Sequence, residues 1–174
     1  ISPLMESYVR RFRGSRECLS LLAEIHFNAG RFDEAVEVAD RAIALGKPHL
    51  GVLLTKANSS FSLRRLEDAA AAYSSALAIA PENLDSMMNL ASIAEIRGDE
   101  ALARFWYLRI LEKYPGQALA LKRLAAAQTR NGFDSEVADV LDRACAADTV
   151  DPQSLVLVGS LFEKAGRIER GSEL

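Results

Sequence analysis

Apolar residues recur every three or four positions in segments that are separated by short polar stretches. In one segment they are Met87, Leu90, Ala91 and Ala94, and in the next they are Leu102, Phe105, Leu108 and Ile110. This spacing places apolar side chains on one face of an α-helix. Residues 97–100, Arg-Gly-Asp-Glu, separate the two segments. The pattern predicts two helices joined by a tight turn.

The same pattern repeats along the chain with a period of 34 residues. Gly30, Gly98, Gly132 and Gly166 are spaced by multiples of this period. Four further series keep it: Ala23, Ala57, Ala91, Ala125 and Gly159; Ala35, Ala69, Ala103 and Val137; Ala39, Tyr73, Tyr107 and Leu141; and Ala42, Ala76, Ile110 and Ala144. A 34-residue period is typical of a helix–turn–helix repeat. Because one such pair cannot bury its apolar stripe alone, adjacent pairs must stack.

Each turn within a pair carries residues suited to end one helix and begin the next. Gly30, Gly98 and Gly132 supply the left-handed residue that closes the first helix. Acidic residues follow them, and these favour the start of the second helix. Arg64 occupies the missing place in the glycine series. If its backbone is left-handed, we expect a cost of about 1 kcal/mol.

The second and third units resemble the tetratricopeptide repeat family. The matching residues are Leu53, Ala57, Ala69, Tyr73, Ala76, Leu77 and Pro81 in the second unit, and Met87, Leu90, Ala91, Gly98, Ala103, Tyr107, Leu111 and Pro115 in the third. The resemblance implies an all-α fold, a right-handed α-solenoid (superhelix) of stacked antiparallel helix pairs. It also implies a non-catalytic scaffold for protein–protein interaction.

The period also sets the expected boundaries of the repeats. Units are expected at residues 16–49, 50–83, 84–117 and 118–151, after the second helix of a preceding repeat at 1–15 and before an incomplete fifth repeat at 152–174. Both ends enter in the middle of a repeat, and neither carries the polar capping helix that ends an array. We therefore interpret the chain as a piece of a longer array or of a multidomain protein.

Composition and charge limit the classes of function. With 49% hydrophobic and 26% charged residues, the chain is typical of a globular protein and not of a disordered one. A net charge of −3 opposes a general nucleic-acid binder. The longest weakly polar run, residues 69–80, is too short to insert across a bilayer. Cys18 and Cys145 are expected to be reduced thiols, which favours the cytoplasm, although a bacterial periplasmic scaffold would have the same features.

Few residues are candidates for catalysis. His26 stands where the family usually has a tyrosine that packs between helices, so we expect a structural role. His49 follows Pro48 in a turn between units, and we expect it to be a solvated loop residue. No phosphate-binding glycine loop, Cys-x-x-Cys or His-Glu-x-x-His spacing occurs. We therefore expect no enzymatic activity, cofactor or metal in this chain.

In this family the first helix of each pair lines a concave groove in which peptides lie. The resemblance implies that the candidate ligand-binding residues are Glu24, Phe27, Leu54, Asn58, Phe61, Met88, Asn89, Lys122, Arg123, Arg130 and Lys164. Phe27 and Phe61, one repeat apart, would either form an apolar strip in this groove or pack into the seam between helices. The groove becomes basic toward the fourth unit. The expected ligand is a protein or peptide with apolar anchors and an acidic stretch.

Some chaperone-adaptor members of the family hold a peptide's carboxylates with a clamp of lysine, asparagine and arginine. Asn58, Asn89 and Arg123 match three of its five places. Leu54 and Leu119 stand where the clamp needs lysine, so the resemblance does not carry over the full clamp. The Asn amides would still hydrogen-bond a ligand's backbone, because an amide both donates and accepts.

Two alternatives to a free peptide ligand stay open. In the first, the array has a structural role and self-associates through its ends or through Trp106, which would form a contact on the outer side of the third unit. In the second, the chain selects substrates for an enzyme whose catalytic part lies outside this sequence.

Overall fold

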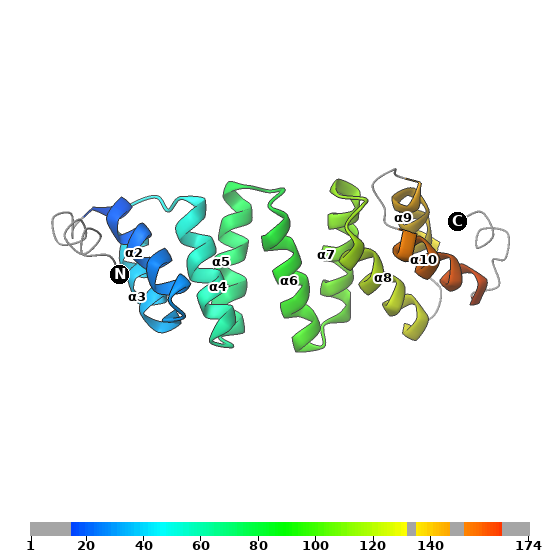
Figure 1. Ribbon diagram of the computed structural model, residues 1–174, viewed down its shortest axis with the longest axis horizontal. Coiled ribbons are helices and arrows are strands. Elements are labelled where there is room, and N and C mark those ends of the chain that lie inside the picture. Colours follow the sequence, from blue (N-terminus) through cyan, green and yellow to red (C-terminus); the bar gives the residue numbers. More distant parts are fainter. Residues whose placement is uncertain (1–14, 132–134, 147–151, 165–174) are drawn as a thin grey trace. The chain divides into compact units, whose positions relative to one another are not determined.

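The computed structural model is helical throughout the parts of the chain that it describes, residues 15–131, 135–146 and 152–164 (Figure 1). The helices are α2 (Arg16–Asn28), α3 (Phe32–Ala44), α4 (Leu50–Ser62), α5 (Leu66–Ile79), α6 (Leu84–Arg97), α7 (Glu100–Lys113), α8 (Ala118–Asn131), α9 (Ser135–Cys145) and α10 (Pro152–Lys164). The expected all-α fold is confirmed. Of the second helix expected at 1–15, residues 1–14 lie outside the described residues, as do residues 165–174 of the expected incomplete fifth repeat.

The helices form two compact units, residues 1–86 and 87–174. In the first unit, α2 packs against α3 and α4, α3 packs against α4, and α4 packs against α5. In the second unit, α8 packs against α7, α9 and α10, and α9 also contacts α7 and α10. Within each unit, therefore, helices of one hairpin contact helices of the next, as stacking requires.

The residues of the repeating series are the ones that lie in these seams. Ala23, Ala57 and Ala91 have no exposed surface, and Ala125 has almost none. Alanine at a helix contact lets the two backbones approach closely, so larger neighbours can fill the remaining space at high density. The apolar series in the sequence therefore marks the packing surface of each hairpin.

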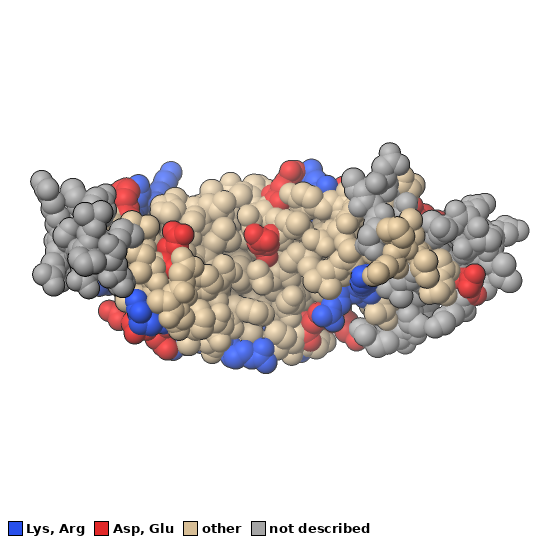
Figure 2. Space-filling model, in the orientation of Figure 1, with Lys and Arg blue, Asp and Glu red and all other residues tan. Residues whose placement is uncertain are grey.

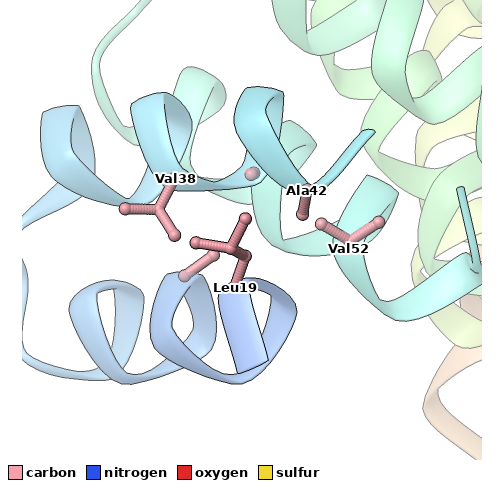
Figure 3. Close-up of a cluster of buried hydrophobic side chains, with 6 residues drawn as sticks. Leu19, Val38, Ala42 and Val52 are labelled. Atoms are coloured by element: carbon pink, nitrogen blue, oxygen red, sulfur yellow. The ribbon is translucent and has the colours of Figure 1, made fainter. Parts of the chain in front are cut away.

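The core of the first unit shows how one hairpin is joined to the next (Figure 3). Leu19 of α2 points toward Val38 of α3, and Val52 of α4 lies beside Ala42 of α3 in the same cluster. All four side chains are buried. The cluster therefore spans three helices and two hairpins, which makes the hairpins dependent on each other for stability.

The turns inside the first three hairpins share one hydrogen-bond pattern. In the first, the Arg31 N–H donates to the His26 carbonyl and the Gly30 N–H donates to the Phe27 carbonyl, both at 2.9 Å. The corresponding bonds in the next two turns run from Arg65 to Ser60, Arg64 to Phe61, Asp99 to Ala94 and Gly98 to Glu95. This pair of bonds is the Schellman motif, which requires a left-handed residue just after the helix.

Arg64 takes this left-handed position in the second hairpin. Its φ is +61°, compared with +72° for Gly30 and +75° for Gly98. Arg64 therefore meets the condition stated for its cost, a left-handed backbone. A side chain in this conformation is crowded by its own following carbonyl, a strain that glycine avoids.

We predict that Arg64→Gly will raise the free energy of unfolding by about 0.5–1 kcal/mol, since strain relief exceeds the added entropy of the unfolded chain. Gly30→Ala is the matched control in the same unit. A Cβ at Gly30 would meet no atom within 4 Å, so its cost, about 1 kcal/mol in the opposite direction, would come from the backbone alone. Urea denaturation of the two variants measures both changes. Destabilisation by Arg64→Gly would contradict this account of the turn.

Candidate ligand-binding surface

The first unit brings two of the candidate aromatic residues to adjacent helices. Phe27 on α2 and Phe61 on α4 hold equivalent repeat positions, and both are half-buried. The ring of Phe27 packs against Phe32 of α3, with centroids 5.8 Å apart and planes tilted by 52°. Phe27 therefore lies partly in the seam between α2 and α3 and keeps part of its surface exposed. Leu54, also half-buried, is on α4 with Phe61.

Asn58 is held in place by a residue of the core. The Tyr73 hydroxyl donates to Asn58 Oδ1 at 2.5 Å. Tyr73 is buried, and this burial, with a smaller effect from the charge of Asp85, raises the pKa of its hydroxyl above the usual value. The hydroxyl therefore remains a donor across the physiological pH range. It orients the Asn58 carboxamide and leaves its NH2 group to donate to a ligand.

Charged side chains are sparse around this part of the first unit. In the view of Figure 2, most of the surface over α4 and α5 belongs to residues other than Lys, Arg, Asp and Glu. Glu24 on α2 is exposed. The first unit thus presents a surface with few charges, on which Phe27, Leu54 and Phe61 are half-buried and the Asn58 amide is oriented.

The second unit contains a cavity of about 260 Å³ between α6, α7 and α8. It is lined by Glu95, Gly98, Glu100, Ala103, Arg104, Tyr107, Arg123, Leu124 and Ala127. Arg123 is the one candidate ligand-binding residue among them. The cavity is open to solvent on one side, and its lining combines small apolar side chains with charges of both signs.

Glu95 is the centre of the polar contacts in this cavity. Its Oε2 lies 3.7 Å from Arg123 Nη1, an ion pair between α6 and α8. The Tyr107 hydroxyl donates to the same carboxylate. Burial of Tyr107, followed by the negative charge of Glu95 and this hydrogen bond, raises the pKa of the hydroxyl above its usual value. Tyr107 therefore orients Glu95, as Tyr73 orients Asn58.

Glu95 is distinguished in the sequence by its repeat position. It lies 34 residues after Phe61 and 68 after Phe27, at the same repeat position. The substitution of an acid for an aromatic residue there marks a change in the chemistry of the surface. The ion pair itself connects different hairpins, so no local pattern revealed it.

The remaining candidate ligand-binding residues lie mainly in the second unit. Met88, Asn89 and Lys122 are half-buried, and Arg123 is exposed. Asn58 belongs to the first unit, whereas Asn89 and Arg123 belong to the second. The side chains of Arg130 and Lys164 lie outside the described residues. The joint use of these residues by one ligand therefore stays a prediction.

Trp106 on α7 is partly covered. Its ring makes an edge contact with Phe105 at 5.1 Å between centroids, and the Arg109 guanidinium lies 5.7 Å from the ring centroid. Its Nε1 is buried and has no acceptor among the described residues. Phe105 has about half of its surface exposed (51%). Self-association through this face stays a prediction.

Both histidines accept local hydrogen bonds through Nδ1. His26 Nδ1 accepts a 2.9 Å hydrogen bond from Arg31 Nε across the first turn. His49 is exposed, but it is more than a solvated loop residue, because its Nδ1 accepts from the Val52 N–H at 3.4 Å and caps the start of α4. The sequence missed this role because a histidine cap has no distinctive pattern.

The part of the chain that the structure describes has neither a membrane-spanning helix nor a cluster of metal-ligating side chains. Within residues 15–131, 135–146 and 152–164, no helix has the length and apolar character needed to cross a bilayer. The same residues contain no group of three His, Cys, Asp or Glu side chains placed to hold a metal ion.

Comparisons with known proteins agree with this architecture. A model of the tetratricopeptide repeat family matches residues 54–118, and a model of anaphase-promoting complex (cyclosome) subunit 3 matches residues 3–76. Among solved structures, YrrB superposes with a TM-score of 0.70 at 14% identity, covering 97% of this chain and 87% of that chain. A MamA structure gives 0.61 at 13% identity, covering 97% and 79%. The fold defines a scaffold of stacked helical hairpins, of a kind that is generally non-catalytic. Residues 54–118 match the tetratricopeptide repeat family, and the fold is of the tetratricopeptide-repeat type.

One similarity is to part of a much longer protein. Human protein O-mannosyl-transferase TMTC1 is 29% identical over 116 residues, which cover 64% of this chain and 13% of that protein. The mouse protein of the same name is 29% identical over 113 residues, covering 63% and 12%. The chain thus corresponds to about an eighth of the length of these two curated relatives.

We predict that acid will destabilise the fold partly through His26. Burial, aided by the nearby charge of Arg31, lowers the pKa of His26 below its ordinary 6.5. The unfolded chain therefore takes up a proton on this residue before the folded chain does, so stability declines as pH falls below 6.5 toward the lower folded-state pKa.

His26→Gln keeps an acceptor for Arg31 and removes the titration. The urea midpoint of the unchanged protein should fall more between about pH 7.5 and about pH 5.5 than that of the variant. Equal losses in both proteins would show that His26 does not contribute.

Proposed function

We propose that the chain is a non-catalytic protein-interaction scaffold that binds an extended segment of a partner protein along its first helices. The observation that carries this proposal is the surface of α2 and α4 in the first unit. There Phe27 and Phe61 are half-buried at equivalent positions of two contacting helices, next to an Asn58 amide that Tyr73 orients.

The physical chemistry of this surface suits an extended peptide. Half-buried aromatic rings provide apolar contact area at little entropic cost, because packing already restricts them. The NH2 group of Asn58 can donate to a peptide carbonyl without specifying a side chain. A peptide held by a few such anchors is expected to bind at roughly micromolar Kd, about −8 kcal/mol.

The comparisons support a peptide ligand. YrrB, which has a similar fold, is described as a TPR protein with an unusual peptide-binding site. We extend peptide binding to this chain on the basis of its own apolar surface and not of shared residues, since the two sequences are only 14% identical.

The second part of the expected ligand, an acidic stretch, depends on the basic residues of the second unit. Arg123 lies beside Glu95, which compensates much of its charge. The attraction for an acidic stretch would therefore come mainly from Lys122, with Arg130 and Lys164. Electrostatic attraction of this kind affects the association rate more than the affinity.

A second candidate function follows from the similarity to protein O-mannosyl-transferase TMTC1. In this alternative the chain is the non-catalytic array of a longer transferase and selects protein acceptors for it. Deletion of the array from such a polypeptide should slow mannose transfer to a whole-protein acceptor more than transfer to a short peptide acceptor. Radiolabelled mannose incorporation measures both rates, and an equal decrease would reject acceptor selection.

We predict that a random-peptide display library selected on the immobilised chain will yield peptides with apolar anchors. Leu54→Ala and Phe61→Ala should each weaken the best peptide about tenfold, because each removes one anchor contact. Phe105→Ala is the matched control, an exposed aromatic residue of α7 outside the proposed surface. Fluorescence anisotropy measures the Kd of each variant.

The same samples need two further measurements. Circular dichroism confirms that each variant remains helical, and light scattering distinguishes peptide binding from self-association through Trp106. If no peptide is enriched, or if Phe61→Ala and Phe105→Ala bind the selected peptide equally well, the proposed surface is wrong.

A further inference from the structure

The cavity between α6, α7 and α8 differs in chemistry from the apolar surface of the first unit. Glu95 stands at the repeat position that holds Phe27 and Phe61 in the preceding hairpins. The lining contains two acidic residues, Glu95 and Glu100, and two basic ones, Arg104 and Arg123. The formal charge of these four side chains is therefore zero.

The balance of charge disfavours a charged ligand. Arg123 Nη1 and Glu95 Oε2 are 3.7 Å apart, so any charge placed beside one is also beside the other. A carboxylate attracted by Arg123 is repelled by Glu95, and an ammonium group attracted by Glu95 is repelled by Arg123. The two Coulomb energies nearly cancel, while the cost of removing the charged group from water remains.

The Glu95–Arg123 pair keeps unused hydrogen-bonding capacity. A separation of 3.7 Å is longer than a direct hydrogen bond, and the Arg123 side chain is 53% exposed. A carboxylate has about four lone-pair sites, and Tyr107 occupies one of those on Glu95. The cavity therefore offers a strong acceptor and a strong donor side by side.

We propose that this cavity binds an uncharged carboxamide, the side chain of an Asn or Gln residue in a bound peptide. The ligand N–H donates to Glu95, and its carbonyl oxygen accepts from Arg123. This assignment rests on the proposed function, and it states which side chain of the bound peptide the second unit recognises.

The dimensions agree with this ligand. The oxygen and nitrogen of an amide are about 2.3 Å apart, so two slightly divergent hydrogen bonds reach groups separated as Glu95 and Arg123 are. The cavity of about 260 Å³ is smaller than the roughly 300–1,000 Å³ of sites for drug-sized molecules. It accommodates one side chain, with Ala103, Leu124 and Ala127 contributing apolar contact.

Tyr107 has a positioning role. Its hydroxyl donates to Glu95, and its burial keeps it protonated, so the carboxylate is fixed in one orientation. A fixed acceptor loses less entropy when the ligand binds than a mobile surface carboxylate would. Tyr107 therefore improves binding without contacting the ligand.

Single residues capped with acetyl and N-methylamide groups provide the probes. The side chains compared are Gln, Glu, Lys and Leu, and the caps are identical in all four. Binding is followed by NMR titration of the isotopically labelled chain, with the backbone amide signals of Ala103, Leu124 and Ala127, which line the cavity in every variant, as local reporters. The Gln probe should bind at about millimolar Kd and about tenfold more tightly than the other three.

Two reciprocal substitutions test the charge pair. Glu95→Gln preserves the acceptor for Tyr107 and leaves the charge of Arg123 uncompensated, so the Glu probe should then bind best. Arg123→Gln leaves Glu95 uncompensated, so the Lys probe should then bind best. Glu24→Gln removes one exposed carboxylate in the first unit and is the matched control, for which the order of probes should not change.

Equal Kd values for the Gln, Glu and Leu probes would overturn the proposal. So would an unchanged order of probes in both Glu95→Gln and Arg123→Gln, provided that their spectra show a folded chain. Neither result concerns the peptide-binding surface of the first unit, which is tested separately with Phe61→Ala. Failure of the carboxamide site is therefore distinguishable from failure of the proposed function.

Discussion

The structure depends on burial of the apolar stripe that each helical hairpin leaves exposed. Alanines of the 34-residue series have almost no exposed surface, and they bring neighbouring helices close enough for Leu19, Val38 and Val52 to share one cluster. No hairpin provides this environment for itself. Stability is therefore a property of neighbouring pairs, and the polar residues of the first helices are released from packing and can serve recognition.

Much of this architecture could be predicted from the sequence because its determinants are local or periodic. The period of 34 residues predicted helical pairs, and the glycine series placed Arg64 at the turn position, where its φ is +61°. The cap formed by His49 and the contacts of Glu95 could not be predicted. They depend on side-chain geometry and on pairs of residues from different hairpins, for which the sequence contains no spacing rule.

The two units present different chemistry on one scaffold. In the first, half-buried Phe27 and Phe61 give an apolar surface, whereas Glu95 holds the equivalent position in the second and pairs with Arg123. One repeat position thus carries an aromatic side chain in the first unit and a member of an ion pair in the second. The helices and turns that carry the position keep the same pattern of backbone hydrogen bonds.

Tyr73 and Tyr107 share a repeat position, and each directs its hydroxyl to a polar residue of a first helix, Asn58 in one hairpin and Glu95 in the other. In both hairpins the buried tyrosine provides the same hydrogen-bond donor, and the side chain that accepts from it differs. Evolution can therefore exchange the group that faces a partner while the interior remains as it was. Arrays of this kind can acquire new binding preferences in single mutational steps.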